Sequence, residues 1–207
     1  MNDEVLSQEY WEKQYQSSGL PWETNRPSSE LQRVISDCHI QPCRAVEFGC
    51  GTGDDAVWLA SRGFEVTAVD LSSEAIDQAR GLARAAGVSV NFIVADVTAP
   101  GVFSDKYDFF YDCGSYTAVH LDDGPAYRHA IERTCRPGAL GLVLMGNALE
   151  PGGEDGPTVL EEWQVRAEWS QGFDIVSLRS FRFDARREGE ARYLGWSCLL
   201  RGASQDR

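Results

Sequence analysis

The chain has 207 residues and a formal net charge of −13, with 43% hydrophobic and 25% charged residues. This length suits one domain with a sizeable core, and the composition is ordinary for a globular protein in water. The acidic balance argues against nucleic acid as the main partner, because binding to phosphates needs a basic face. We therefore expect a single domain over residues 1–207 and no nucleic-acid partner.

Signals for secretion, membrane insertion and metal binding are not found in the sequence. The apolar runs are shorter than the roughly 18 residues of a membrane span, and the N-terminus MNDEVLSQEYWEKQ has neither a basic n-region nor an apolar h-region. The six cysteines, at positions 38, 43, 50, 113, 135 and 198, form no C-x-x-C pair. We expect reduced thiols, a cytoplasmic location, no membrane partner and no metal site.

Two helices are predicted before the first strand, at about residues 7–17 and 29–38. The second begins with Ser29-Glu30-Leu31-Gln32, a candidate capping box. Strands near 45–48, 65–69, 90–94, 107–112 and 139–145 then alternate with helices near 54–62, 73–86 and 123–135, the last with Pro125 near its first turn. This alternation is typical of a parallel sheet covered by helices.

The C-terminal part breaks the alternation. A helix is predicted at about 158–169, where Thr158-x-x-Glu161 forms a second candidate capping box. Two long strands follow, at about 173–183 and 192–201, joined by a polar connector that suggests an antiparallel pair. The predicted fold is α/β, a doubly wound, mostly parallel seven-stranded sheet that ends in a C-terminal antiparallel hairpin.

The most informative stretch joins the first strand to the next helix. It reads Val46-Glu47-Phe48-Gly49-Cys50-Gly51-Thr52-Gly53, with three glycines at alternate positions after the strand. Glycine lets the backbone turn tightly and approach a ligand closely, and a ligand there meets N–H groups of the turn and of the helix N-terminus. An ordinary strand-to-helix turn with structural glycines is the alternative.

An acidic residue downstream favours the ligand-binding interpretation. Asp70 ends the second strand, 17 residues after Gly53, where a carboxylate can hold the two hydroxyls of a ribose. The third glycine comes one residue too early for the dinucleotide pattern G-x-G-x-x-G. Glu47 would repel a pyrophosphate but attract a cationic amino-acid end. With Asp96 and Asp112, these carboxylates fall at or near strand ends and converge on one site.

At this point the chain resembles the class I S-adenosylmethionine-dependent methyltransferases. The turn Glu47-Phe48-Gly49-Cys50-Gly51-Thr52-Gly53 is similar to their first motif, and Asp70 matches the ribose-binding acid. Three later blocks also match: Val94–Val97, whose Asp96 would contact the adenine amine, Tyr107–Gly114, which would face the transferred methyl, and Cys135–Leu140. The resemblance implies a Rossmann-like fold and these cofactor-binding residues: Trp11, Trp22, Glu47, Gly49, Cys50, Gly51, Gly53, Asp70, Leu71, Asp96, Val97 and Asp112.

The N-terminal segment narrows the resemblance. Four segments are similar to the branch that includes thiopurine, thiol, halide and tellurite methyltransferases. They are Tyr10-Trp11-x-x-x-Tyr15, Leu20-Pro21-Trp22-Glu23-Thr24-Asn25-Arg26-Pro27, Asp112–Ala118 and Leu194–Leu200. The aromatics either seal the core or form a lid, since a sulfonium is attracted to aromatic faces and a reactive donor needs shelter from water. We expect lid helices over residues 1–40 and the core over 41–207. Asn25 stands where the resemblance leads us to expect glycine, and Ser115-Tyr116-Thr117 replaces the Cys-Phe-His that is common in several members of the branch.

The resemblance implies methyl transfer from S-adenosylmethionine to a small molecule by direct SN2 displacement, with S-adenosylhomocysteine as product. A thiol, sulfide or other soft acceptor leads, because a thiol with a pKa of about 8.5 needs little or no general base. The alternatives are an oxygen or nitrogen acceptor on a small natural product, and a regulator that binds the cofactor without catalysis. Candidate catalytic residues are Asp112, Tyr116 and His120, while His39 and His129 are expected at the surface. The acceptor and the choice between monomer and homodimer stay open.

Overall fold

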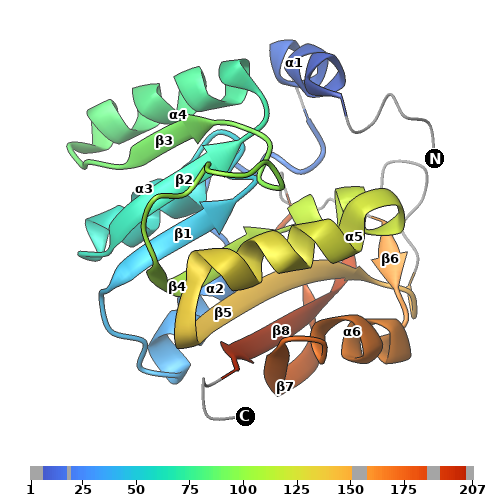
Figure 1. Cartoon of the computed structure of the whole chain (residues 1–207). Coiled ribbons are helices and arrows are strands. Elements are labelled where there is room, and N and C mark those ends of the chain that lie inside the picture. Colours follow the sequence, from blue (N-terminus) through green and yellow to red (C-terminus); the bar gives the residue numbers. More distant parts are fainter. Residues whose placement is uncertain (1–6, 18–19, 151–157, 186–191, 204–207) are drawn as a thin grey trace.

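A single sheet organises the molecule (Figure 1). The computed structural model describes residues 7–17, 20–150, 158–185 and 192–203. The strands are β1 (Arg44–Phe48), β2 (Glu65–Asp70), β3 (Asn91–Val94), β4 (Tyr107–Cys113), β5 (Cys135–Asn147), β6 (Val159–Leu160), β7 (Phe173–Arg182) and β8 (Leu194–Gly202). The helices are α1 (Gln8–Gln16), α2 (Ser29–Asp37), α3 (Asp54–Ser61), α4 (Ser73–Ala86), α5 (Ser115–Thr134) and α6 (Glu162–Trp169).

The strand order is β3-β2-β1-β4-β5-β8-β7, and β6 pairs with β5 outside this path. The pairs among β1 to β6 are parallel, whereas β8 is antiparallel to both β5 and β7. The mostly parallel sheet with a C-terminal antiparallel hairpin is thus confirmed, and β8 is the reversed strand. The short β6 makes the sheet eight-stranded rather than seven-stranded.

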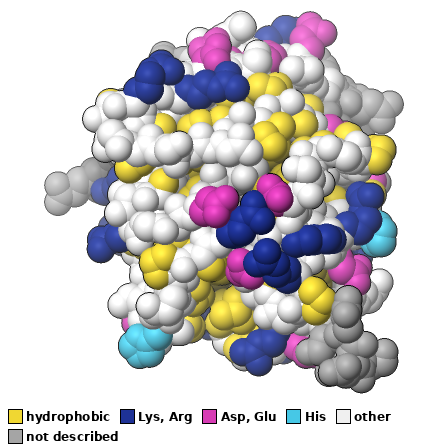
Figure 2. Space-filling view, turned by 60° about the vertical axis from the view of Figure 1, so that its left-hand side comes forward, with side chains coloured by type: hydrophobic (Ala, Val, Ile, Leu, Met, Phe, Trp, Pro, Cys, Tyr) yellow, Lys and Arg dark blue, Asp and Glu magenta, His cyan; other side chains and the backbone are white. Residues whose placement is uncertain are grey.

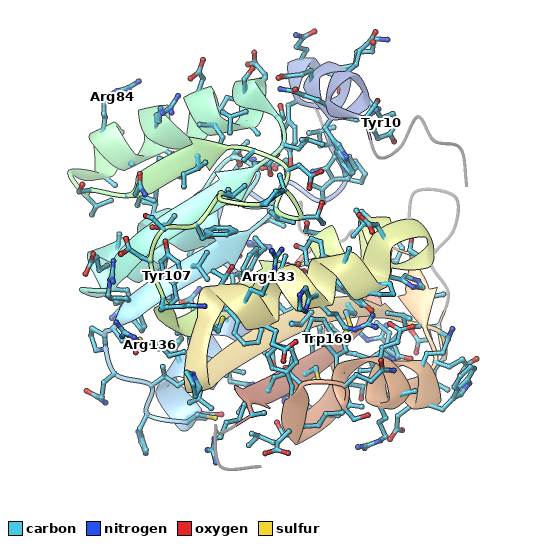
Figure 3. The ribbon with its side chains drawn as sticks, in the orientation of Figure 1. Tyr10, Arg84, Tyr107, Arg133, Arg136 and Trp169 are labelled. Atoms are coloured by element: carbon cyan, nitrogen blue, oxygen red, sulfur yellow. The ribbon has the colours of Figure 1, made fainter. Side chains whose placement is uncertain are left out.

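Helices cover both faces of the sheet, as the nearly continuous apolar strands require. On one face, Tyr127 and Ile131 of α5 and Trp169 of α6 belong to the same core cluster as Phe110 and Val143. Trp169 points toward α5 (Figure 3), and its ring lies 4.8 Å from that of Tyr116. On the other face, side chains of α2, α3 and α4 pack against β1, β2 and β4. Helix α1 covers neither face; it lies beyond the strand ends to which the arrows of β1 and β2 point and contacts α4 (Figure 1).

Helix α5 starts earlier than expected. Gly114, in left-handed geometry with φ of 85°, precedes the helix, and Asp123 interrupts it with non-helical φ and ψ of −137° and 19°. The expected helix at 123–135 corresponds to the part after this kink. Pro125 lies within that part near its start, where the missing N–H costs no helical bond. The part before the kink was not expected from the sequence.

Neither predicted capping box forms at the expected residues. Ser28, not Ser29, caps α2, and its Oγ accepts from the Leu31 N–H at 3.3 Å. Helix α6 is capped by Glu161, which exchanges bonds with Gln164, so the predicted box at Thr158 is wrong. The reason is that Val159 and Leu160 pair with β5 as a strand and delay the start of the helix.

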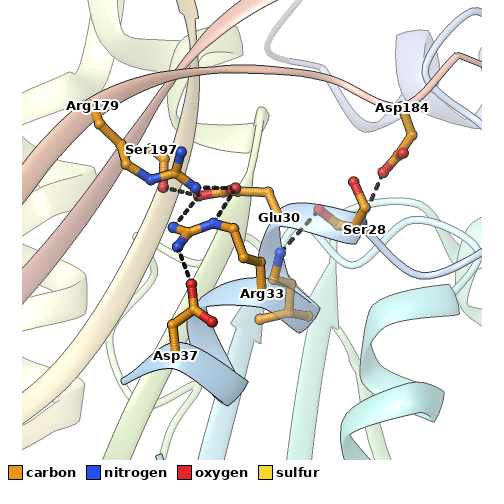
Figure 4. Close-up of polar contacts among 9 residues, drawn as sticks. Ser28, Glu30, Arg33, Asp37, Arg179, Asp184 and Ser197 are labelled. Carbon is orange, nitrogen blue, oxygen red and sulfur yellow. Dashed lines mark hydrogen bonds and ion pairs between the residues drawn. The ribbon is translucent and has the colours of Figure 1, made fainter. Parts of the chain in front are cut away.

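A buried carboxylate fixes α2 to the far edge of the sheet (Figure 4). Glu30 is 5% exposed and accepts hydrogen bonds from Arg33, from Arg179 of β7 and from Ser197 of β8. Burial by itself would raise the pKa of Glu30, but the bonds from Arg33 and Ser197 and the charge of Arg179 lower it. The segment that precedes β1 is therefore held in place by residues from the C-terminal hairpin.

In the part of the chain that the structure describes, none of the helices has the length and apolarity that a bilayer crossing requires.

Candidate active site

The glycine turn after β1 requires glycine for two structural reasons. Gly49, Gly51 and Gly53 have φ values of 65°, 51° and 87°, in the left-handed region that side chains rarely adopt. In addition, a Cβ on Gly49 would lie 2.4 Å from Cβ of Ser115, and one on Gly53 would lie 2.7 Å from Cβ of Ala79. At these two positions the absent side chain leaves room for the protein itself, so close approach of a ligand is not needed to explain them.

Asp70 bridges the glycine turn and the start of α4. Its carboxylate accepts from the N–H of Gly51 at 2.8 Å and from the N–H of Ser72 at 2.9 Å, and the residue is 7% exposed. Burial raises its pKa, against the opposing effect of these backbone bonds. Each carboxylate oxygen has a second lone pair, so the group can still accept bonds from a ligand's hydroxyls.

Glu47 and Asp112 are buried carboxylates on the neighbouring strands β1 and β4, and Asp112 lies opposite Phe48, the residue after Glu47. Glu47 is 3% exposed, and its Oε2 has no hydrogen-bond partner among the described residues. Burial raises the pKa of Glu47 well above its usual value, and Asp55 and Asp112 add to the effect. Burial also raises the pKa of Asp112 to about 7. A cation placed here would relieve this electrostatic cost.

Both carboxylate oxygens of Asp112 accept hydrogen bonds from residues of helix α5. The Tyr127 hydroxyl donates to Oδ2 at 2.6 Å, and the Tyr116 N–H lies 3.0 and 3.3 Å from the two oxygens. The Tyr127 hydroxyl is also 2.9 Å from Oγ of Ser115, the residue that packs on Gly49. Tyr127 was not predicted from the sequence, because it differs in no visible way from other apolar positions of the helix.

The remaining predicted cofactor residues lie around this centre. Asp96 is exposed just beyond β3, and its Oδ1 accepts from the N–H and hydroxyl of Thr98, both at 2.8 Å. Val97 packs against the core, Leu71 is half-buried, and Cys50 is buried in the turn.

The N-terminal aromatics lie over the glycine turn. Trp11 and Trp22 meet edge to face with centroids 5.9 Å apart, and Tyr15 packs 6.4 Å from Trp22. Tyr10, labelled on α1 in Figure 3, packs 5.2 Å from Trp11. The Tyr15 hydroxyl lies 3.0 Å from the point where Gly51 would carry a Cβ.

A carboxylate from the same segment also reaches the turn. Glu23 accepts from the Thr52 hydroxyl, and its Oε1 lies 3.1 Å from the Cβ position of Gly51. Burial raises the pKa of Glu23. The sequence marked Glu23 only as part of a motif, so its contact with the glycine turn is a finding of the structure.

Tyr116 and His120 lie on the first part of α5. Tyr116 is fully buried, and its hydroxyl accepts from Arg128 at 2.6 Å and donates to Glu168 of α6. Burial raises the pKa of Tyr116, and the bond to Glu168 adds to the effect. His120 is 8% exposed, with its ring 6.0 Å from the Tyr116 ring. The surface positions predicted for His39 and His129 are confirmed.

Comparisons with known proteins agree with this arrangement. A methyltransferase domain family matches residues 45–138. The 2-heptyl-1-hydroxyquinolin-4(1H)-one methyltransferase of Mycobacteroides abscessus is 26% identical over 171 residues, 82% of this chain and 75% of that protein. Probable thiol methyltransferase 2 of Arabidopsis thaliana is 23% identical over 136 residues, 65% of this chain and 60% of that protein.

A solved structure described as "Conversion of a Disulfide Bond into a Thioacetal Group during Echinomycin Biosynthesis" superposes with a TM-score of 0.83. It is 25% identical and covers 97% of this chain and 94% of that one. Residues 45–138 match a methyltransferase domain, and the chain is similar to class I S-adenosylmethionine-dependent methyltransferases. Within that class it resembles the branch that acts on small molecules, and solved structures of similar fold hold S-adenosylhomocysteine or S-adenosylmethionine, in agreement with S-adenosylmethionine as the expected cofactor.

Proposed function

We propose that this methyltransferase transfers its methyl group to a small soft nucleophile, first of all a thiol or sulfide, by direct displacement. The observation that carries the proposal is that two of its three candidate bases are already engaged. Asp112 accepts bonds from Tyr127 and Tyr116, and the Tyr116 hydroxyl is held between Arg128 and Glu168. An acceptor that ionises by itself suits such a site.

The described residues fit the cofactor. S-adenosylmethionine supplies a methyl group on a sulfonium, which a nucleophile displaces in line. We propose that Asp70 binds the ribose hydroxyls, that Asp96 contacts the adenine amine, and that Glu47 faces the ammonium end. Among the described residues the buried Oε2 of Glu47 has no hydrogen-bond partner, which supports this assignment, because a charged donor would satisfy it.

The protein's work in this reaction is mainly orientation. With the cofactor bound, a thiolate that has already lost its proton to water would take the methyl group, and S-adenosylhomocysteine would leave as a neutral thioether. The attacking atom must come within roughly 3–3.5 Å of the carbon, in line with the leaving sulfur. Trp11 and Trp22 are proposed to cover the sulfonium, where an aromatic face contributes about 0.5–2 kcal/mol and water is excluded.

The two relatives described above support a small acceptor but disagree on its chemistry. One is named a thiol methyltransferase and another a hydroxyquinolinone methyltransferase, so an oxygen or nitrogen acceptor is the second candidate. Figure 2 shows a face on which positive and negative side chains are mixed rather than gathered in a basic band. With the net charge of −13, this supports a small-molecule partner over nucleic acid.

The pH profile of the rate separates the two acceptor classes. For a thiol we expect the rate to rise with the thiol's own ionisation and to shift to lower pH with a more acidic thiol. Replacing His120 with alanine should then cost little, whereas loss of a general base would cost about 10²–10⁴-fold. The measurement is release of S-adenosylhomocysteine with small thiols, sulfide, iodide and phenols.

His129→Ala, at an exposed position on the same helix, is the matched control. A profile near the histidine pKa for every acceptor, lost in His120→Ala but kept in His129→Ala, would overturn the soft-acceptor proposal in favour of oxygen or nitrogen.

A further inference from the structure

Helix α1 is joined to the cofactor site by one carboxylate, that of Glu12. Its Oε1 accepts from the N–H and hydroxyl of Ser73, at 2.8 and 2.6 Å. Its Oε2 accepts from the Ser72 hydroxyl at 2.9 Å and from the Glu74 N–H at 3.0 Å. We propose that Glu12 is a positioning residue for the cofactor, which holds α1 over the glycine turn by capping the N-terminus of α4.

The geometry is that of a helix cap supplied from a distant part of the chain. The first four N–H groups of a helix have no intrahelical acceptor. In α4 these are the N–H groups of Ser72, Ser73, Glu74 and Ala75; Asp70 accepts from Ser72 at 2.9 Å, and the Ser72 side chain accepts from Ala75 at 3.2 Å. Glu12 accepts from the other two, at Ser73 and Glu74, and its negative charge lies at the positive end of the helix dipole.

The same contacts reach the proposed ribose carboxylate. Ser72 donates its hydroxyl to Glu12 and its backbone N–H to Asp70, so it stands between the two acids. On α1, three residues beyond Glu12, Tyr15 accepts at its carbonyl from Gln78 of α4 at 3.2 Å and places its hydroxyl at Gly51. Movement of α1 would therefore disturb both ends of the Asp70 bridge.

The contact between Glu12 and the N-terminus of α4 persists across the neutral pH range. Burial acts to raise the pKa of Glu12, but the bonds from Ser73, Glu74 and Ser72 outweigh it and lower the pKa to about 2, from an ordinary 4.5. A lowered pKa means that the contribution of Glu12 to stability is complete above about pH 4.5 and is lost as the pH falls toward 2. Glu12 therefore holds α1 against α4 throughout the neutral pH range and does not act as a pH switch.

The test measures cofactor binding without any acceptor, so its result is independent of the proposed thiol chemistry. S-adenosylhomocysteine is titrated calorimetrically into the wild type, Glu12→Gln and Glu12→Ala, at a temperature where all are folded. We expect its dissociation constant to rise about two- to threefold in Glu12→Gln and about tenfold in Glu12→Ala, because glutamine keeps one acceptor oxygen. Amide exchange should become faster in residues 8–16.

Glu9→Gln is the matched control, because Glu9 lies on the same helix but pairs with Lys13 and is 79% exposed. The double variant Glu12→Ala, Ser73→Ala should bind S-adenosylhomocysteine no more weakly than Glu12→Ala alone, because both substitutions remove the same contact between Glu12 and Ser73. Faster exchange in α1 with unchanged affinity would show that Glu12 is only structural. Unchanged exchange and affinity in Glu12→Ala would overturn the anchor itself.

Discussion

Replacing Asp70 with alanine is expected to weaken S-adenosylmethionine binding by about 10- to 100-fold. The variant loses the proposed charge-assisted hydrogen bonds to the ribose, which contribute about 1.5–3 kcal/mol. It also leaves the N–H groups of Gly51 and Ser72 without their acceptor, so the glycine turn itself loosens. Titration calorimetry measures the change directly, and NAD should bind neither the wild type nor the variant.

Two further variants separate the ribose contact from the loss of the turn. Asp70→Asn keeps one carbonyl oxygen for the backbone but removes the charge, and should fall between wild type and Asp70→Ala. Glu65→Ala changes an acid at the opposite end of β2, where the side chain is 73% exposed, and should leave affinity unchanged. If Asp70→Ala binds the cofactor as tightly as the wild type, Asp70 is not the ribose ligand.

Glu47→Gln should change stability and affinity in opposite directions. Glu47 is buried with one oxygen unpartnered among the described residues and is surrounded by other carboxylates, so it destabilises the cofactor-free protein. The neutral amide of the same size should raise the free energy of unfolding by about 1–3 kcal/mol. The same change removes the charge proposed to face the ammonium group, and S-adenosylmethionine binding should weaken about 10- to 100-fold.

The pH dependence gives this prediction a definite sign. An acid whose pKa is raised on folding costs stability as the pH rises above its ordinary value, here 4.5, because only the unfolded chain ionises freely. The stability difference between Glu47→Gln and the wild type should therefore be small near pH 4 and grow toward neutral pH. Chemical denaturation at several pH values measures it.

Glu65→Gln is the control for a general effect of removing an acid, since Glu65 is exposed on the same sheet. A Glu47→Gln protein that is less stable than the wild type at neutral pH would show that Glu47 has a partner essential to the fold. Unchanged cofactor affinity in a stabilised variant would instead remove Glu47 from the binding site.

The sequence by itself determined the framework and the location of the site. Alternating apolar strands and helices depend on local periodicity, and a parallel sheet necessarily brings its strand ends to one edge. The glycine turn, Asp70 and Asp112 are each recognisable within a few residues of the strand that carries them. The parallel order, the antiparallel C-terminal hairpin and the gathering of these acids could therefore be predicted.

Only the tertiary structure decided which groups these residues contact. Glu12 caps a helix some 60 residues away, and Tyr116 is held by Arg128 and Glu168 from two different helices. The pairing of β6 with β5 also moved the start of α6 past the predicted cap. Such contacts depend on how elements pack in space. A hydrogen bond between residues far apart in the sequence leaves no periodic signal along the chain. The roles of Glu12, Glu23 and Tyr127 thus emerge only when distant segments are brought together.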